Sequence, residues 1–366
     1  MLDRLPPELL DKVLELAAPV QPIETYGRNA VDHKPIVCAC SLVCRAVRER
    51  AQPLLWRRFE PVHLGRISQL ASLGQTRLLE LDTYVSDAKL NGAFLQQPLP
   101  LDFLSSFSRL DTLHLSTLVG AAPLDLEKLA ITSHLRRLFL ERVDIKPVIR
   151  PITFPTLEVL SMSECAMLAQ TSAALFVTAT FPSLRAFAWM NLKHPGTEDH
   201  FFPSLSPAFI SQLDMMQMYS NVLRDGVPTS TFLHGTPILL SVPVTDLTTD
   251  AWLAPLHRLP NLRVRLAHLE LASVGLFLLM QGSVSANLVK LVSGSNPPRA
   301  VQVLRAMQAS ARNRNSMMGK LVEACERNGV EMLWHDEGEE NDVHVSPSFW
   351  QYAKELKAAQ AAADAA

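Results

Sequence analysis

The chain has 366 residues, of which 48% are hydrophobic and 19% are charged, so it can bury a large core. The 34 Lys and Arg residues and 36 Asp and Glu residues give a formal net charge of -2. Because no overall positive field exists to hold a phosphate backbone, we expect no nucleic-acid partner.

The N-terminus predicts neither a secretory signal nor a membrane anchor. Asp3 and Arg4 are charged and no apolar leader follows them, while the longest apolar run, Leu271 to Met280, is too short to cross a bilayer. Five cysteines without regular spacing are typical of a reducing compartment. We therefore expect a cytoplasmic or nuclear protein with no membrane partner.

The first predicted element is a helix from about Pro6 to Ala17, because two prolines stand where a first helical turn tolerates them. At a period of 3.6 residues its apolar side chains form two adjoining rows. The rows are Leu9, Val13 and Leu16, and Leu10, Leu14 and Ala17. A small helical unit needs less apolar surface than this for its own core, so one row is expected to contact another protein.

A second helix is predicted from Ile36 to Ala51, and Pro53 is expected to open a third, short turn. That turn carries Leu55 and Trp56, the largest apolar side chains of the region. A helical unit of about 50 residues is marginally stable alone, so docking on a partner would stabilise it.

Residues 1–60 resemble an F-box in the order and chemical type of their side chains. The match consists of Leu5-Pro6, Glu8-Leu9, Val13, Leu16, Leu42-Val43-Cys44-Arg45 and Leu55-Trp56. The resemblance implies a three-helix domain that binds the Skp adaptor of a Skp-Cullin-F-box ubiquitin ligase and, through it, the cullin. The expected adaptor-binding residues are Leu5, Pro6, Leu9, Val13, Leu16, Leu42, Val43, Cys44, Val47, Leu55 and Trp56.

Two features depart from the family pattern. The linker from Pro19 to Pro35 is longer than the usual tight turn between the first two helices, and Val47 stands where the family often has an aromatic residue. Because lengthening a loop costs little free energy, we interpret the linker as a surface insertion.

A template, L-x-x-L-x-L, recurs after this region. Its clearest copies are RLDTLHL at 109–115, HLRRLFL at 134–140, TLEVLSM at 156–162 and SLRAFAW at 183–189. Their first leucines, Leu110, Leu135, Leu157 and Leu184, are spaced within the range of leucine-rich repeats. Weaker copies are at Leu78 to Thr83, Ile210 to Met215 and Ile238 to Val242, with a last copy at either Leu259 to Val264 or Leu266 to Leu271.

The repeats predict an α/β fold, in which the N-terminal three-helix F-box is followed by an irregular leucine-rich-repeat solenoid with parallel strands at 70–335. The strand positions between the template leucines are expected to line an open concave surface that suits recognition of a protein substrate. They are Thr112, His114, Arg137, Phe139, Val159, Ser161, Arg185 and Ala188. An ordinary α/β core with chance copies of the template remains the alternative.

The C-terminal part closes with a helix over 320–329 that ends at Gly329, followed by a strand from Val330 to Trp334. Leu321, Val322, Ala324 and Cys325 are expected to be buried in that helix. Residues 336–366 are read as an acidic loop and an Ala-rich C-terminal helix or tail.

No pattern in the sequence predicts catalysis, a cofactor or a metal site. Phosphate-binding glycine loops and the G-x-S-x-G motif do not occur. Cys38, Cys40 and Cys44 are read as small buried residues rather than zinc ligands, since positions two apart on a helix face different ways. The acidic run from His335 to His344 is read as a solvated loop.

The sequence therefore predicts a non-enzymatic substrate-recognition subunit of a ubiquitin ligase, which docks the Skp adaptor and recruits an unknown protein target. Two alternatives remain. The chain could be a non-catalytic interaction scaffold whose F-box-like helices only cap a repeat domain and have no ligase role. A hydrolase or transferase within the repeats would need convergent polar groups in a pocket.

Overall fold

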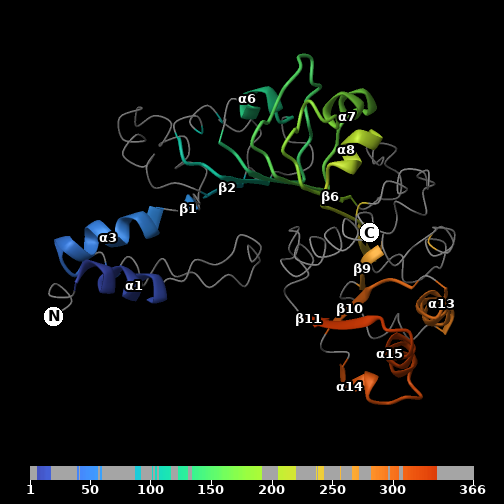
Figure 1. Cartoon of the computed structure of the whole chain (residues 1–366). Helices are drawn as coiled ribbons and strands as arrows, with labels where there is room; N and C mark the ends of the chain where they lie inside the picture. Colours follow the sequence, from blue (N-terminus) through green and yellow to red (C-terminus); the bar gives the residue numbers. More distant parts are fainter. Residues whose placement is uncertain are drawn as a thin grey trace, which may run out of the picture. The chain divides into compact units, whose positions relative to one another are not determined.

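The computed structural model describes residues 6–17, 39–40, 42–56, 58–59, 87–91, 101, 104, 107–116, 123–130, 134–191, 205–219, 236, 238–242, 256, 266–271, 282–295, 297–304 and 308–335. These residues form an α/β structure whose strands pair in parallel wherever the structure describes their pairing (Figure 1). The fold class expected from the sequence is confirmed at this level.

The chain divides into two compact units. The first comprises Met1–Leu160, Cys165–Leu175 and Ala179–Ser183, and the second comprises Ser161–Glu164, Phe176–Thr178 and Leu184–Ala366. The division therefore crosses the segment 70–335, which the sequence treats as a single domain.

The N-terminal helices of the first unit are α1 (Pro7–Ala17) and α3 (Arg45–Trp56). The predicted first helix is confirmed, but the second and third differ from expectation. The amides of Leu42 and Val43 bond to the carbonyls three residues earlier, which makes a turn, and α3 then continues through Pro53 to Trp56. Pro53 removes one helical hydrogen bond but does not end the helix.

The strands of the first unit are β1 (Arg58–Phe59), β2 (Asp87–Asn91), β3 (Thr112–Ser116) and β4 (Arg137–Glu141), with the first residues of β5 (Val159–Ser163). They lie in chain order, and Leu113 of β3 stands opposite Leu138 of β4. Two short helices belong to the connections, α6 (Leu126–Ala130) and α7 (Ala169–Leu175). The predicted strands at 110–115, 135–140 and 157–162 are thus confirmed, whereas β2 was not expected and the copy at 78–83 lies outside the described residues.

The second unit contains a run of six parallel strands. They are β6 (Ala186–Met190), β7 (Met215–Tyr219), β8 (Ile238–Val242), β9 (Leu266–Leu271), β10 (Ala300–Leu304) and β11 (Glu331–His335). Among the described residues, the helices of this unit are α8 (Pro207–Ser211), α13 (Gly282–Val292), α14 (Gln308–Ala311) and α15 (Met317–Arg327). The copy predicted at 238–242 coincides with β8, and of the two alternatives for the last copy, 266–271 coincides with β9 whereas 259–264 lies outside the described residues. The copy at 210–215 ends at the first residue of β7.

Aromatic side chains fill the core on the face of the strands that carries the leucines of the L-x-x-L-x-L template. In the second unit, the Phe187 ring lies 5.1 Å from that of Phe176 and 5.7 Å from that of Phe209, between centroids. In the first unit, Phe154 and Phe181 stack at 5.5 Å. The two near-identical phrases Phe154-Pro155-Thr156-Leu157 and Phe181-Pro182-Ser183-Leu184 thus place their leading aromatic rings against each other.

Strands β3 to β7 do not present the expected open concave surface, because their described residues are largely buried on both faces. Phe139 and Ala188, which the sequence places outward, are buried, and His114 is only 8% exposed. The buried outward positions are Thr112, His114, Phe139, Ser161 and Ala188, while Arg137 and Val159 are half-buried and Arg185 is exposed. The alternation of apolar and polar residues identified the strands correctly but did not reveal that the second face is covered.

The last elements match the prediction closely. Ser316 caps α15 by accepting a hydrogen bond from Gly319 N, and Gly329 follows the helix with φ 64°. A Cβ atom on Gly319 would lie 2.1 Å from Asn313 O, so this close approach requires glycine. Of the four residues expected to be buried, only Val322 is half-buried.

Candidate protein-binding surface

The core between α1 and α3 uses one of the two apolar rows of α1. Helices α1 and α3 lie side by side (Figure 1). Leu10 and Leu14 are buried against Val47 and Ala51, and three more side chains, Cys40, Cys44 and Leu54, pack partly against this cluster. The four central side chains are at most 4% exposed. This row therefore holds the two helices together.

The other row of α1 is exposed. Leu9, Val13 and Leu16 are 51%, 45% and 75% exposed, and in the turn before α3 Leu42 and Val43 are 76% and 58% exposed. We call these five residues the exposed apolar set. Single exposed leucines are ordinary, but five large apolar side chains on so small a helical pair are typical of a protein-binding surface.

Two ion pairs accompany this arrangement. The guanidinium of Arg50 on α3 bonds to the carboxylate of Asp11 on α1, and Arg45 pairs with Glu49 one helical turn away at 2.8 Å. The hydrogen bond that the Arg50 guanidinium donates to Asp11 raises the pKa of Arg50 above its ordinary value. Both pairs are solvent-exposed, so they contribute little stability, but the first one links the two helices.

The structure places the sequence-predicted adaptor residues in three different settings. Leu9, Val13, Leu16, Leu42 and Val43 are exposed, as is Pro6. Cys44 is half-buried and Val47 is only 1% exposed, so Val47 belongs to the core instead of the predicted binding surface. Leu5 and the side chains of Leu55 and Trp56 lie outside what the structure describes.

A polar pair of side chains, His114 and Glu141, joins β3 and β4. His114 Nε2 is 3.6 Å from Glu141 Oε2, and the His114 ring packs edge-on against Phe139. The contact with His114 lowers the pKa of Glu141, against the opposing effect of burial. Sequence reasoning named His114 as an outward residue but missed this pair, because only the parallel register brings its two members together.

Two of the described cysteines, Cys165 and Cys325, do not resemble reactive thiols. Burial raises the pKa of Cys325 to about 12, and Cys165 is buried with its Sγ 3.5 Å from Leu140 O. A thiol with a raised pKa is a poor nucleophile at neutral pH. Cys40 and Cys44 are free thiols that pack partly against the core between α1 and α3, so they are half-buried where the sequence predicts buried residues, and Cys38 lies outside the described residues.

Within the described ranges, no group of three or more His, Cys, Asp or Glu side chains could hold a metal ion. The acidic run at 335–344, which the sequence reads as a solvated loop, lies almost wholly beyond those ranges. Among the described helices, none is long and apolar enough to cross a bilayer.

Comparisons with known proteins add no assignment. No family model and no curated protein sequence matches this chain. The F-box resemblance is therefore carried by the residues quoted above, and its consequences are proposals.

Proposed function

We propose that this chain is a substrate-recognition subunit of a Skp-Cullin-F-box type ubiquitin ligase. Its N-terminal helices would dock the Skp adaptor and thereby the cullin, and the rest of the chain would hold an unknown protein target. It would perform no chemistry of its own. It would promote ubiquitylation by holding the target near the ligase, which raises the effective concentration of the target there.

The observation that supports this proposal most strongly is the division of α1 into a buried and an exposed row. Leu10 and Leu14 already satisfy the core with α3, so Leu9, Val13 and Leu16 are free to contact another protein. Burying an exposed leucine or valine side chain contributes roughly 1.5 to 3 kcal/mol. The exposed apolar set can therefore supply enough free energy for specific docking.

We also propose that the strands form an irregular leucine-rich-repeat solenoid. Successive copies of L-x-x-L-x-L give successive parallel strands, and the segments after them pair again through Asp144 and Ala166. The residue that follows β4, Arg142, has φ 54°, and its equivalent after β5, Glu164, has φ 52°. A shared left-handed turn at equivalent positions supports a repeating unit.

In such a solenoid the target would bind away from the buried strand faces. Arg185 and the half-buried Arg137 are among the outward positions that solvent still reaches. The loops after the strands also carry exposed apolar residues, with Ile149 at 81% and Leu168 at 59%. These are the positions at which we would begin a search for target contacts.

The test is affinity purification of the full-length chain from cells treated with a proteasome inhibitor. We expect the Skp adaptor and cullin to co-purify with the chain, and ubiquitylated targets to accumulate on it. A matched variant, Ile149→Asp with Leu168→Asp, should retain the adaptor, because it changes exposed apolar residues outside the N-terminal helices.

A chain that recovers partner proteins but neither adaptor nor cullin would overturn the ligase assignment. That outcome would favour the interaction scaffold, in which the same helices only cap the strands.

A further inference from the structure

The residue after the first leucine of the template alternates in charge from copy to copy. Asp111, Arg136, Glu158 and Arg185 follow the first leucines Leu110, Leu135, Leu157 and Leu184, respectively. Asp214 follows Leu213, which has the same place directly before β7 that Leu184 has before β6, although the sequence template was aligned there three residues earlier. The sign is negative, positive, negative, positive, negative along five successive copies. We call these five residues the strand-start charges, because each lies just before or at the beginning of a strand.

The backbone puts these residues in equivalent places. The carbonyl oxygen of Asp111 accepts hydrogen bonds from the amides of Arg136 and Arg137, at 2.8 and 2.9 Å. The carbonyl oxygen of Arg136 accepts two from Glu158 and Val159, at 2.7 and 3.0 Å. In the second unit, the amides of Asp214 and Met215 bond to Arg185 O in the same way.

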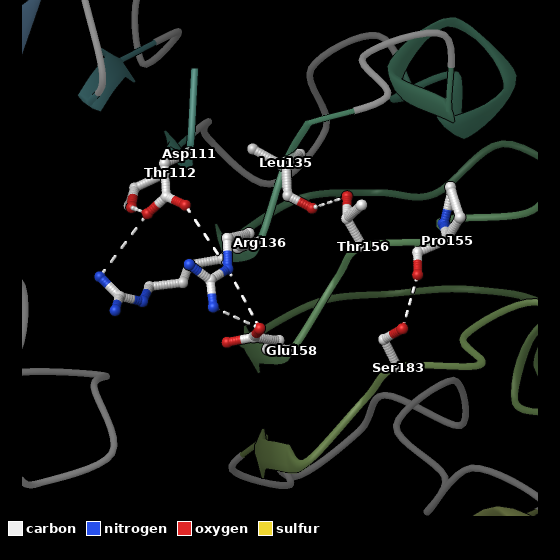
Figure 2. Close-up of polar contacts among 9 residues, drawn as sticks. Asp111, Thr112, Leu135, Arg136, Pro155, Thr156, Glu158 and Ser183 are labelled. Atoms are coloured by element: carbon white, nitrogen blue, oxygen red, sulfur yellow. Dashed lines mark hydrogen bonds and ion pairs between the residues drawn. The ribbon is translucent and has the colours of Figure 1, made fainter. Parts of the chain in front are cut away.

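The side chains of neighbouring strand-start charges form ion pairs in the first unit. Figure 2 shows the Arg136 guanidinium between two carboxylates, with Nη2 2.5 Å from Glu158 Oε1 and Nε 3.8 Å from Asp111 Oδ1. Asp111 also lies 3.7 Å from Arg137 Nη1. Glu158 and Asp111 both raise the pKa of Arg136, with the Glu158 hydrogen bond as the largest cause.

The apolar part of the template cannot specify which copy packs beside which. Leu110, Leu135, Leu157 and Leu184 are the same residue, and all four are buried at 1% exposure or less. A copy that packed one place out of order would therefore still bury a leucine in the correct position. The charge at the next residue differs between neighbours, so it distinguishes one order from another.

We propose that the strand-start charges are a built-in device that fixes the order of neighbouring strands. An opposite charge on each side favours the native neighbour, whereas skipping one copy would place Asp111 beside Glu158 or Arg136 beside Arg185. Like charges directly opposite each other in a sheet are destabilising. This inference does not depend on the proposed ligase function.

The test compares thermal unfolding of the full-length chain in two charge variants at one position. Arg136→Gln removes the attraction, and Arg136→Glu also places a negative charge between Asp111 and Glu158. In about 20 mM salt, where screening is weak, we expect a midpoint about 2 to 5 °C lower for the Glu variant than for the Gln variant. The thermal midpoint of Glu158→Lys should likewise be lower than that of Glu158→Gln.

Salt separates electrostatic ordering from a packing effect. In about 1 M NaCl the screening length falls to roughly 3 Å, so the difference between the Glu and Gln variants should shrink to about 1 °C or less. The control is Arg314→Glu, at an exposed arginine in the loop before α15, and it should change the midpoint little at either salt concentration. Equal midpoints for the paired variants, or a difference that persists in 1 M NaCl, would overturn the proposal.

Discussion

The N-terminal helices and the strands differ in how much of their apolar surface is exposed to solvent. On α1, Leu16 remains 75% exposed although the row beside it is buried, whereas on β6 all five residues are buried, including both alanines of the outward face. Even the polar side chains of Thr112 and His114 on β3 are buried. One row of apolar side chains on α1 is thus exposed to solvent, whereas on β3 and β6 even polar or outward-facing side chains are buried.

This contrast identifies the apolar surface that is available to a partner. Free energy for docking comes mainly from apolar area that is still in water, and among the described residues that area is on the N-terminal helices and at Ile149 and Leu168 in the loops after the strands. The outward faces of β3 to β6 have little of it left, so their burial contributes to stability. The following predictions each test one side of the contrast.

The largest effect is expected in the aromatic core of the second unit. Phe187→Ala removes a fully buried ring that contacts Phe176 and Phe209, and it should lower the free energy of unfolding by about 3 to 5 kcal/mol. Denaturant unfolding of the full-length chain would measure the change. Ile149→Ala, at an exposed position, should stay within about 0.5 kcal/mol of wild type. Equal effects would show that the burial assigned to β6 is wrong.

A matched pair on α1 should separate its two rows. Leu14→Ala leaves a cavity against Val47 and should destabilise the helices by about 2 to 4 kcal/mol, because Leu14 is only 2% exposed. Leu16→Ala should change stability by less than about 0.5 kcal/mol. Hydrogen exchange of peptides covering 7–17 would measure both, and comparable loss of protection in both variants would contradict the assignment of the rows.

Glu141 should make stability depend on pH in the acid range. Its pKa is lowered by His114 in the folded chain, so its contribution is present at neutral pH and is lost as the pH falls below about 4. Because Glu141 is partly exposed, Glu141→Gln should cost about 1 kcal/mol at pH 7. The denaturant midpoints of wild type and Glu141→Gln should converge as the pH is lowered from 7 to 3. A difference between the two midpoints that stays constant or widens toward acid would refute this role.

The smallest effect is expected at the left-handed turns. Arg142 has φ 54°, which costs most residues free energy but not glycine, so Arg142→Gly should stabilise the chain by roughly 0.5 to 1 kcal/mol. Arg142→Ala is the control, because it removes the charge but keeps the constraint on φ. Thermal midpoints that rank Ala at or above Gly would argue against a strained turn.

The sequence predicted what periodicity and spacing determine. The four clear copies of the template became β3, β4, β5 and β6, and the helix before Gly329 has its expected position. The weaker copies were placed unevenly: 238–242 coincides with β8, whereas 210–215 ends at the first residue of β7, and β2 was not predicted. Local pattern determines a strand reliably only when the alternation is strong.

Burial on the second face was not predictable from the sequence. Whether His114 or Ala188 is in water depends on segments distant in the chain, and alternation along one strand contains no information about them. Similarly, the two apolar rows of α1 were recognised, but the sequence did not determine that Val47 would join the buried row. Tertiary packing decides between equivalent apolar positions.

The most direct test of the account is a calorimetric titration of the full-length chain with a purified Skp adaptor. We expect a one-to-one complex with a negative heat-capacity change, since the exposed apolar set would be buried on binding. Leu9→Asp with Val43→Asp should weaken binding by at least about 100-fold, while Ile149→Asp with Leu168→Asp should leave it unchanged. No binding by the wild-type chain, or undiminished binding by the Leu9 and Val43 variant, would contradict the account.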